Sequence, residues 1–330
     1  MTASPAGPEW AAAMRALAAQ CGRAPSAHNT QPWQLRYEDS GVGVYWDPMR
    51  ALPVSDPTGR DLFLGLGAYL ETCLVVAAGA GLGADVVVDV DRAARRVAWL
   101  VPAAEPYATR FTANDVASRR SARGPYAAGP LPDDVLDEAA ALVEDAGGIR
   151  HLPARALAPL LARADRWMFA APEVTAELRE WLRLRPSHPR YAQDGLTDRA
   201  LGLSRAEAAG LEMMLRPRVY GTFRRAGLPA ALAASSRGLL RGEGTALVLV
   251  GPAAAGPAEL VALGRALMRS WLALAVRGLA THPLSQILDC PATAAELAAM
   301  LDLAAHERAV AVFRTGRPLI EPPRSARRGG

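Results

Sequence analysis

The sequence contains no lysine, so all 37 basic side chains among its 330 residues are arginine. The formal net charge of +4 matches the five arginines and one glutamate of residues 314–330, which leaves the rest of the chain close to neutral. A nucleic-acid-binding face needs basic residues spread along a helix or sheet and interleaved with exposed aromatic residues. We therefore predict that the protein has no nucleic-acid partner.

Cysteine is also scarce. Cys21, Cys73 and Cys290 lie far apart, and none has the spacing of a metal site. We predict free, buried thiols in a reducing compartment and no bound metal ion. The N-terminal residues lack the basic segment and apolar core of a signal peptide, so we expect a cytoplasmic protein.

Motifs of several enzyme classes are missing. The sequence has no GxxxxGK[ST] loop, HExxH pair or GxSxG elbow, so P-loop, zincin and serine-hydrolase chemistry have no support. The glycine cluster at 79–83 ends a predicted helix and precedes a strand, whereas a dinucleotide-binding loop follows a strand and begins a helix. The apolar stretch 62–84 is rich in glycine, carries Glu71 and precedes a strand-like segment, which favours a core helix over a membrane span.

Half of the residues are hydrophobic, which predicts a globular protein with a large core. Periodicity predicts helices over 9–22, 61–79, 105–118, 131–146, 153–169, 172–184 and 259–278, and strands over 34–37, 42–46, 84–90, 97–101, 149–152 and 245–251. The helices 61–79 and 259–277 both end in Gly-Leu before an extended segment, which indicates an internal repeat.

The chain therefore divides into two predicted units, residues 1–102 and 103–330. Residues 185–244 are loosely patterned, with short helical pieces at 204–215 and 230–239. So long an irregular insertion in a compact chain is typical of a lid over a binding site.

The segment APSAHNTQPW at 24–33 lies between a predicted helix and a predicted strand. Its polar residues Ser26, His28, Asn29, Thr30 and Gln31 can present hydrogen-bonding groups to a flat heteroaromatic ring, with Trp33 packed beneath. The same pattern also fits an ordinary helix-to-strand turn.

A second polar segment combines Arg119, Arg120, Ser121 and Arg123 within five residues. Guanidinium groups that converge with a hydroxyl suit a phosphate monoester, whose two charges need several donors. The alternative is a solvated basic turn.

Together these segments resemble a known family. APSAHNTQPW resembles the SxxNxQPW segment of the nitroreductase superfamily, and RRSARGPYAAGPLP resembles the RRSxRxF segment with which those proteins bind FMN phosphate. With DPTGRDL and the terminal PPRSARR, the chain is similar to the two-repeat, Acg-type branch. The resemblance implies an α+β nitroreductase-like fold in which two fused repeats, each a mainly antiparallel sheet packed with helices, form an intramolecular pseudo-dimer.

The resemblance also implies one composite FMN site per chain, because each repeat lacks a motif that the other has. The implied phosphate and ribityl contacts are Arg119, Arg120, Ser121 and Arg123, completed by Arg324 and by Arg327 or Arg328. The implied ring contacts are Pro25, Ser26 and Asn29, together with Pro283, Leu284, Ser285 and Gln286, where Ser285-Gln286 replaces the usual Glu-Gly near flavin N5. His28 is a candidate catalytic proton donor, with a structural hydrogen-bonding role as the alternative.

The implied function is that of an FMN-dependent oxidoreductase. It would pass electrons between NAD(P)H or an organic substrate and a small organic acceptor, with a specialised metabolite among the candidates. One alternative is a flavin-sequestering protein with an occluded, inactive site, and another is loss of flavin at 285–286. The expected partners are a small-molecule substrate and no membrane. Fusion of the repeats favours a monomeric pseudo-dimer and leaves a homo-oligomer open.

Overall fold

Two four-stranded antiparallel sheets make up most of the strand content of the computed structural model, which describes residues 7–234, 240 and 244–328. The first sheet has the order β1-β2-β4-β3 and the second has the order β5-β8-β10-β9. The first comprises β1 (Trp33–Glu38), β2 (Gly41–Trp46), β3 (Ala84–Asp91) and β4 (Arg96–Pro102), and the second β5 (Gly148–Pro153), β8 (Thr245–Pro252), β9 (Ala280–Pro283) and β10 (Glu307–Gly316).

The two sheets have the same topology. Helix α3 (Arg60–Gly79) connects the second strand of the first sheet to its third, and α12 (Pro257–Val276) makes the same connection in the second sheet. The predicted α+β class with mainly antiparallel sheets is confirmed, and the repeated topology agrees with the internal repeat. The division at residue 102 follows the end of β4 and stays a prediction.

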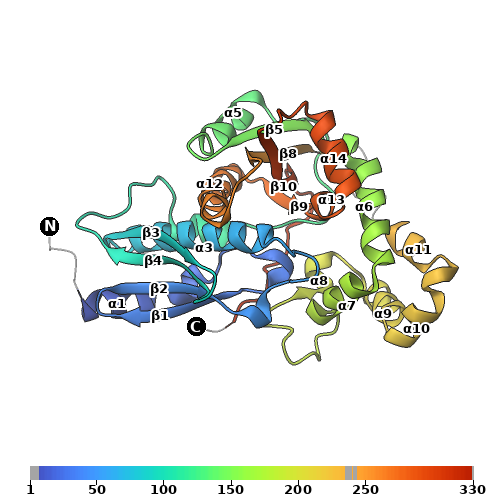
Figure 1. The fold of residues 1–330 in the computed structure, drawn as a ribbon, viewed down its shortest axis with the longest axis horizontal. Helices are drawn as coiled ribbons and strands as arrows, with labels where there is room; N and C mark the ends of the chain where they lie inside the picture. The colour runs from blue at the N-terminus through green and yellow to red at the C-terminus, as the bar shows by residue number, and fades with distance from the viewer. Residues whose placement is uncertain (1–6, 235–239, 241–243, 329–330) are drawn as a thin grey trace.

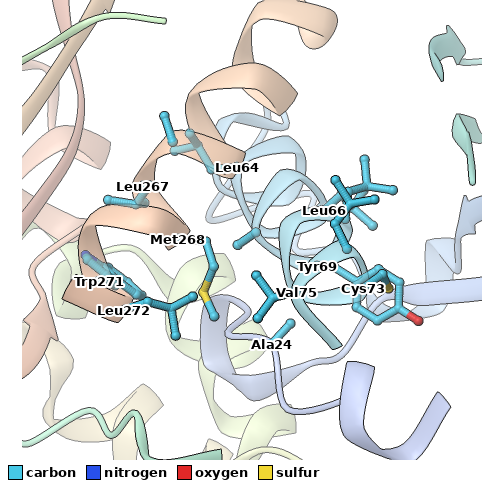
Figure 2. Packing of buried hydrophobic residues seen from close by; sticks show 14 of the residues in the cluster. Ala24, Leu64, Leu66, Tyr69, Cys73, Val75, Leu267, Met268, Trp271 and Leu272 are labelled. Atoms are coloured by element: carbon cyan, nitrogen blue, oxygen red, sulfur yellow. The ribbon is translucent and has the colours of Figure 1, made fainter. Parts of the chain in front are cut away.

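Helices α3 and α12 pack against each other between the two sheets (Figure 1). Their apolar side chains form one buried cluster, in which Val75 of α3 and Met268 of α12 are both fully buried (Figure 2). In the described part of the chain, α3 alone is long and apolar enough to cross a membrane, yet 78% of its apolar window is buried inside the protein. The three cysteines are free and buried, as predicted.

Several predicted helices have different bounds. The prediction of a helix over 105–118 is wrong in its first half, because Pro106 disfavours helix before it and a capping box between Thr112 and Asp115 begins α4 (Ala113–Ser118). The segment 9–22 divides at Leu17 into α1 (Pro8–Ala16) and α2 (Ala18–Cys21). Helix α5 (Asp133–Ala141) ends before the predicted Ala146.

The second half contains a group of short elements that extends to one side of the molecule (Figure 1). Its first elements are η3 (Ala154–Leu157), α6 (Ala158–Ala170), α7 (Pro172–Trp181), β6 (Leu182–Arg183) and β7 (Leu196–Thr197). Then follow α8 (Asp198–Leu201), α9 (Arg205–Met214), α10 (Pro217–Phe223), η4 (Arg224–Ala226) and α11 (Leu228–Ala234). The helix predicted over 204–215 is confirmed. That over 230–239 overlaps α11, and its residues 235–239 lie outside the described residues.

Candidate functional site

A cavity of about 370 Å³ lies where the two halves and the 185–244 insertion meet. Its walls include the 25–29 segment, α3, α12, the 119–123 segment and residues Ser325 and Arg327 near the C-terminus. Most of the predicted site residues line it, namely Pro25, Ser26, His28, Asn29, Arg119, Ser121, Arg123, Pro283, Ser285, Gln286 and Arg327. Both polar segments identified in the sequence thus contribute to one cavity.

Four predicted site residues are not part of the cavity lining. Leu284 is fully buried in the second hydrophobic cluster. Arg120 and Arg324 lie close enough for their charges to interact, beside the lining residue Arg119. Arg328 donates to the carbonyl oxygens of Gln31 and Trp33.

The 24–33 segment has an unusual backbone. His28, Asn29 and Gln31 have φ angles of 46°, 55° and 53°, a left-handed region that non-glycine residues rarely adopt. The Ser26 hydroxyl accepts a hydrogen bond from the Gln31 backbone N–H at 2.9 Å and closes the turn. Trp33 stacks on Tyr69 of α3 with ring centroids 4.5 Å apart, which anchors the segment as predicted.

The amide of Asn29 connects three segments that are distant in sequence. Its Nδ2 donates to the carbonyl oxygens of Gly195 at 3.2 Å and Ala326 at 3.0 Å, and its Oδ1 accepts from Arg327 at 2.7 Å. Both hydrogens of the amide therefore have partners within the protein. Asn29 lines the cavity, but its polar atoms hold the protein together rather than pointing free into the cavity.

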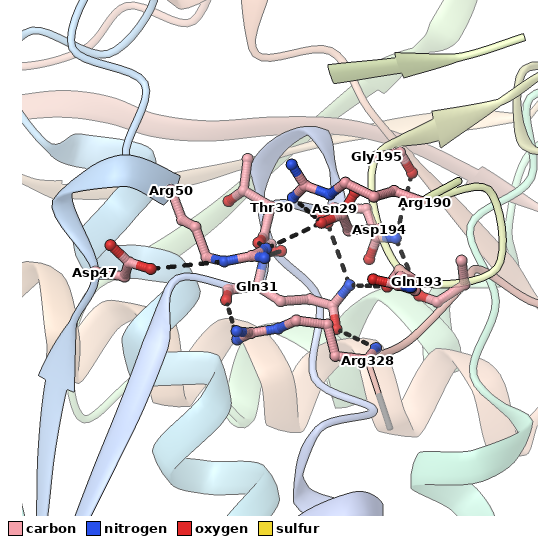
Figure 3. Close-up of polar contacts among 12 residues, drawn as sticks. Asn29, Thr30, Gln31, Asp47, Arg50, Arg190, Gln193, Asp194, Gly195 and Arg328 are labelled. Atoms are coloured by element: carbon pink, nitrogen blue, oxygen red, sulfur yellow. Dashed lines mark hydrogen bonds and ion pairs between the residues drawn. The ribbon is translucent and has the colours of Figure 1, made fainter. Parts of the chain in front are cut away.

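Gln31 makes a parallel set of contacts (Figure 3). Its Nε2 donates to the Gln193 carbonyl oxygen at 2.8 Å, and its Oε1 accepts from the Arg328 backbone N–H at 3.0 Å. The C-terminal residues 325–328 therefore reach from the second repeat to the first and close over the 24–33 segment. The sequence alone could not show these contacts, because they join residues about 160 and 300 positions apart.

Asp194 stabilises the insertion beside this segment (Figure 3). Its fully buried carboxylate pairs with Arg50 at 3.1 Å and Arg183 at 2.9 Å, and also with Arg190. Burial by itself would raise the pKa of this carboxyl, but the hydrogen bonds and charges of Arg190 and Arg183 lower it. Arg50 also donates to the Thr30 carbonyl oxygen, so Asp194 links the insertion to the first repeat.

A group of arginines forms the most positive part of the site. Burial and the neighbouring charges of Arg23 and Arg120 lower the pKa of Arg119 to about 10, and burial followed by the same kind of repulsion lowers that of Arg327. Arg119 is 7% exposed, and its Nε and one terminal nitrogen are buried without a hydrogen-bond partner, as are the Nε atoms of Arg23, Arg120 and Arg327. In the described part of the chain none of these four forms an ion pair with a carboxylate, although Glu321 lies near enough for its charge to oppose the lowering of the Arg120 pKa by burial and by Arg324.

Arg123 has a different environment from its neighbours. Its guanidinium donates to the Ala200 carbonyl oxygen of α8 at 3.0 Å and lies near Arg314. The preceding residues pair with β9, where the Ala122 N–H donates to the Thr281 carbonyl oxygen at 3.0 Å. Arg123 lines the cavity and also ties the second polar segment to the insertion, and its role as a phosphate contact stays a prediction.

His28 lines the cavity, and its Nδ1 is buried without a partner among the described residues. Burial lowers the pKa of this imidazole to about 4, with the charge of Arg123 also lowering it and those of Glu177 and Asp61 opposing. His28 is therefore neutral at physiological pH with one N–H left to donate, and its role as a proton donor stays a prediction.

A carboxylate group that the sequence prediction missed lines another part of the cavity. Asp61 and Asp289, on α3 and on α13 (Gln286–Asp289), share the Arg60 guanidinium with N–O distances of 2.8 Å each, and Asp56 accepts from the Leu62 N–H. Burial and the charge of Asp61 raise the pKa of Asp289 to about 7, against the opposing effect of Arg60. The DPTGRDL segment contains two of these acids, but its sequence gave no sign of their partner near residue 289.

Comparison with known proteins gives a partial sequence match. The chain is 45% identical over 64 residues to the Mycobacterium tuberculosis protein named "Putative NAD(P)H nitroreductase acg", covering 19% of each chain. It is 34% identical over 113 residues to "Putative NAD(P)H nitroreductase Rv3131" of the same species, covering 33% of each chain. The matched stretches thus span between a fifth and a third of these relatives. No family model matches the chain.

Solved structures give a weaker likeness. The FMN and NADPH-dependent nitroreductase NfnB from Sphigopyxis sp. strain HMH matches with 20% identity and a TM-score of 0.36, covering 66% of this chain and 94% of that one. NfnB from Mycobacterium smegmatis in complex with NADPH matches with 17% identity and a TM-score of 0.37, covering 64% and 92%. These scores are too low to define the fold, which follows from the topology above. The sequence relatives confirm the resemblance to the nitroreductase superfamily.

Proposed function

We propose that this protein is an FMN-dependent oxidoreductase of the nitroreductase type. The observation that carries the proposal is the group of arginines without an ion-pair partner, two of which, Arg119 and Arg327, line the cavity beside the 24–33 segment. One buried and three half-buried cations with unpartnered nitrogens are costly unless an anion with many acceptor oxygens joins them. A phosphate monoester such as that of FMN fits this requirement.

Arg119, Arg120 and Arg327 are the proposed phosphate residues, and Arg23 joins them as a fourth cation that the sequence prediction did not include. Ser121 lines the cavity next to Arg119 and is a proposed contact to the phosphate or ribityl chain. Pro25, Ser26, Ser285 and Gln286 line it as proposed neighbours of the ring. FMN, when bound, supplies reversible two-electron transfer, for which the protein provides binding, orientation and electrostatics.

The other residues of the site would position the cofactor and control access to the cavity. Asn29 and Gln31 would fix the ring side of the site through residues 193–195 and 326–328, while the insertion limits entry of water. We propose NAD(P)H or an organic substrate as electron donor and a small organic molecule as acceptor, in a cytoplasmic, monomeric protein. A specialised metabolite belongs to the proposed acceptors.

A second function is favoured by one observation. The insertion contributes Leu196, Leu201, Leu211 and Leu215 to the cavity lining, so it covers the site that would hold the flavin. A cover of this kind also suits a protein that sequesters flavin and catalyses no reaction with it. The two functions differ in whether a reductant reaches the bound flavin.

Absorbance of the purified protein and titration of the flavin-free protein with FMN test the proposal. We expect a yellow protein that binds FMN, and at least tenfold weaker binding in Arg119→Gln, about 1.4 kcal/mol. Arg155→Gln is the matched control, because Arg155 is exposed and far from the cavity lining. A colourless protein that takes up no FMN would overturn the proposal. Rapid bleaching of bound FMN by NADPH, followed by reoxidation, favours the enzyme, and an inert oxidised flavin favours sequestration.

A further inference from the structure

The cavity has two separate charged regions on its wall. Arg119 and Arg327 belong to the cationic group, while Asp56, Asp61 and Asp289 form an anionic one, and no ion pair joins the two among the described residues. Burial lowers the pKa of His28, and the charges of Glu177 and Asp61 oppose this, so His28 lies near the anionic region. The proposed cofactor uses only the cationic region, so the anionic one is left without an assigned role.

The anionic region has more negative than positive groups. Asp61 and Asp289 share one guanidinium, that of Arg60, and their side chains are 16% and 19% exposed. Asp56 has a backbone N–H as its partner, which brings no full charge. The repulsion is visible in the raised pKa values of Asp56 and Asp289, for which burial is the first cause and Asp61 the second. A further cation here would relieve this repulsion.

The part of the wall that α6, α7 and α9 contribute is mainly apolar. It includes Trp167, Phe169, Val174 and Leu178 of α6 and α7 and Leu211 of α9. Two other residues show that the cavity is built for a ligand: Trp271 and Arg119 are at least nine-tenths buried, yet the indole nitrogen of Trp271 and two nitrogens of Arg119 have no partner. Such groups are normally satisfied in a complete structure.

We propose that the cavity binds an apolar organic substrate that carries a protonated amine, with the amine at Asp61 and Asp289 and the apolar part against α6, α7 and α9. The inference rests on the proposed function, because the substrate would lie beside bound FMN. The carboxylates would select against carboxylate-bearing acceptors of the same size. Charge, rather than shape alone, would thus decide which acceptors enter.

Binding of matched probes to the FMN-loaded protein tests this inference. The probes are 4-nitrobenzylamine, 4-nitrobenzyl alcohol and 4-nitrobenzoate, and their dissociation constants are measured at pH 7.5 by isothermal titration and by perturbation of the flavin spectrum. We expect the amine to bind at least tenfold more tightly than the carboxylate, with the alcohol between them. The double variant Asp61→Asn, Asp289→Asn should reduce this preference to less than threefold.

Two controls separate the outcomes. Asp137→Asn, an exposed change on α5, should keep the wild-type preference. FMN affinity and thermal unfolding of the double variant show that its site is still assembled. If FMN binds and the amine has no advantage, or the advantage survives in the double variant, the inference is overturned while the proposed function stands. Absence of FMN binding in the wild type would instead overturn the proposed function.

Discussion

Gly67 of α3 and Gly264 of α12 occupy equivalent positions where the two central helices cross. A Cβ atom added to Gly67 would lie 2.1 Å from the Val261 carbonyl oxygen, and one added to Gly264 would lie 2.2 Å from the Leu64 carbonyl oxygen. Each helix thus needs a glycine because the backbone of the other passes directly over it. This reciprocal contact is what a pseudo-twofold relation between the two repeats predicts.

Substitution of Gly67 by alanine should destabilise the protein by about 2 kcal/mol or more, because the helices must move apart and loosen the core around them. Urea unfolding followed by circular dichroism measures this change. Gly210→Ala is the matched control, since Gly210 lies inside α9 with nothing within 4 Å of its added Cβ and should be neutral or slightly stabilising. Equal effects of the two changes would contradict the close approach.

The same correspondence predicts the flavin content. Gly65 and Ala68 of α3 line the cavity. The equivalent positions of α12 are Ala262 and Arg265, which line a different part of the molecule. Arg265 donates to the fully buried Glu71 at 3.0 Å, and Glu71 also accepts from Tyr107 at 2.8 Å. A cavity of about 390 Å³ lies at this second place, but its arginines, Arg265 and Arg269, already pair with Glu71 and Asp145 and are not available to a phosphate.

We therefore expect one FMN per chain after saturation. The ratio is obtained from flavin absorbance of the denatured sample against protein concentration by amino-acid analysis. Two flavins per chain would show that the Glu71 cluster opens to admit a second ligand. The missing motifs of each repeat lead to the same ratio, and the structure adds the physical reason for it.

Removing the Asn29 amide should loosen three segments together. Asn29→Ala deletes the bonds to Gly195, Ala326 and Arg327 and removes this donor from the buried Gly195 carbonyl oxygen, whereas the Ala326 carbonyl oxygen keeps its bond from Arg327. We expect FMN binding at least tenfold weaker, about 1.4 kcal/mol, although Asn29 does not contribute a free polar group to the cavity. FMN titration checks this, and Gln34→Ala, an exposed change on β1, should have no such effect.

Local patterns in the sequence were sufficient for the sheets, the two central helices and both polar segments. They failed where tertiary contacts decide. Arg123 stays a predicted phosphate residue, but the pattern did not show that its guanidinium also bonds to the Ala200 carbonyl oxygen of α8. Arg23 belongs to no recognised motif. It joins the cationic group because residues 325–328 return to the first repeat, where Arg23 donates to the Ser325 carbonyl oxygen. The site could be located from sequence, whereas the partners of each side chain depend on chain segments hundreds of residues apart.

The raised pKa of Asp289 predicts that the stability of the protein depends on pH. The pKa of Asp289 is raised from 3.8 to about 7 in the folded protein, so between these values the folded state holds a proton that the unfolded state has released. Ionisation of Asp289 therefore lowers the free energy of unfolding as pH rises from about 4 to 7, and the loss is complete above pH 7.

Asp289→Asn removes this titration and keeps a group of the same shape. At pH 8 the variant should be more stable than the wild type by about 1 kcal/mol or more, since each pKa unit corresponds to about 1.4 kcal/mol, and at pH 4 the two should be nearly equal. Thermal unfolding at both pH values measures the difference, with Asp137→Asn as a control that should show none. A variant that is less stable at pH 8 would mean that the Arg60 pair outweighs burial and the repulsion by Asp61, which would place the pKa of Asp289 below its ordinary value.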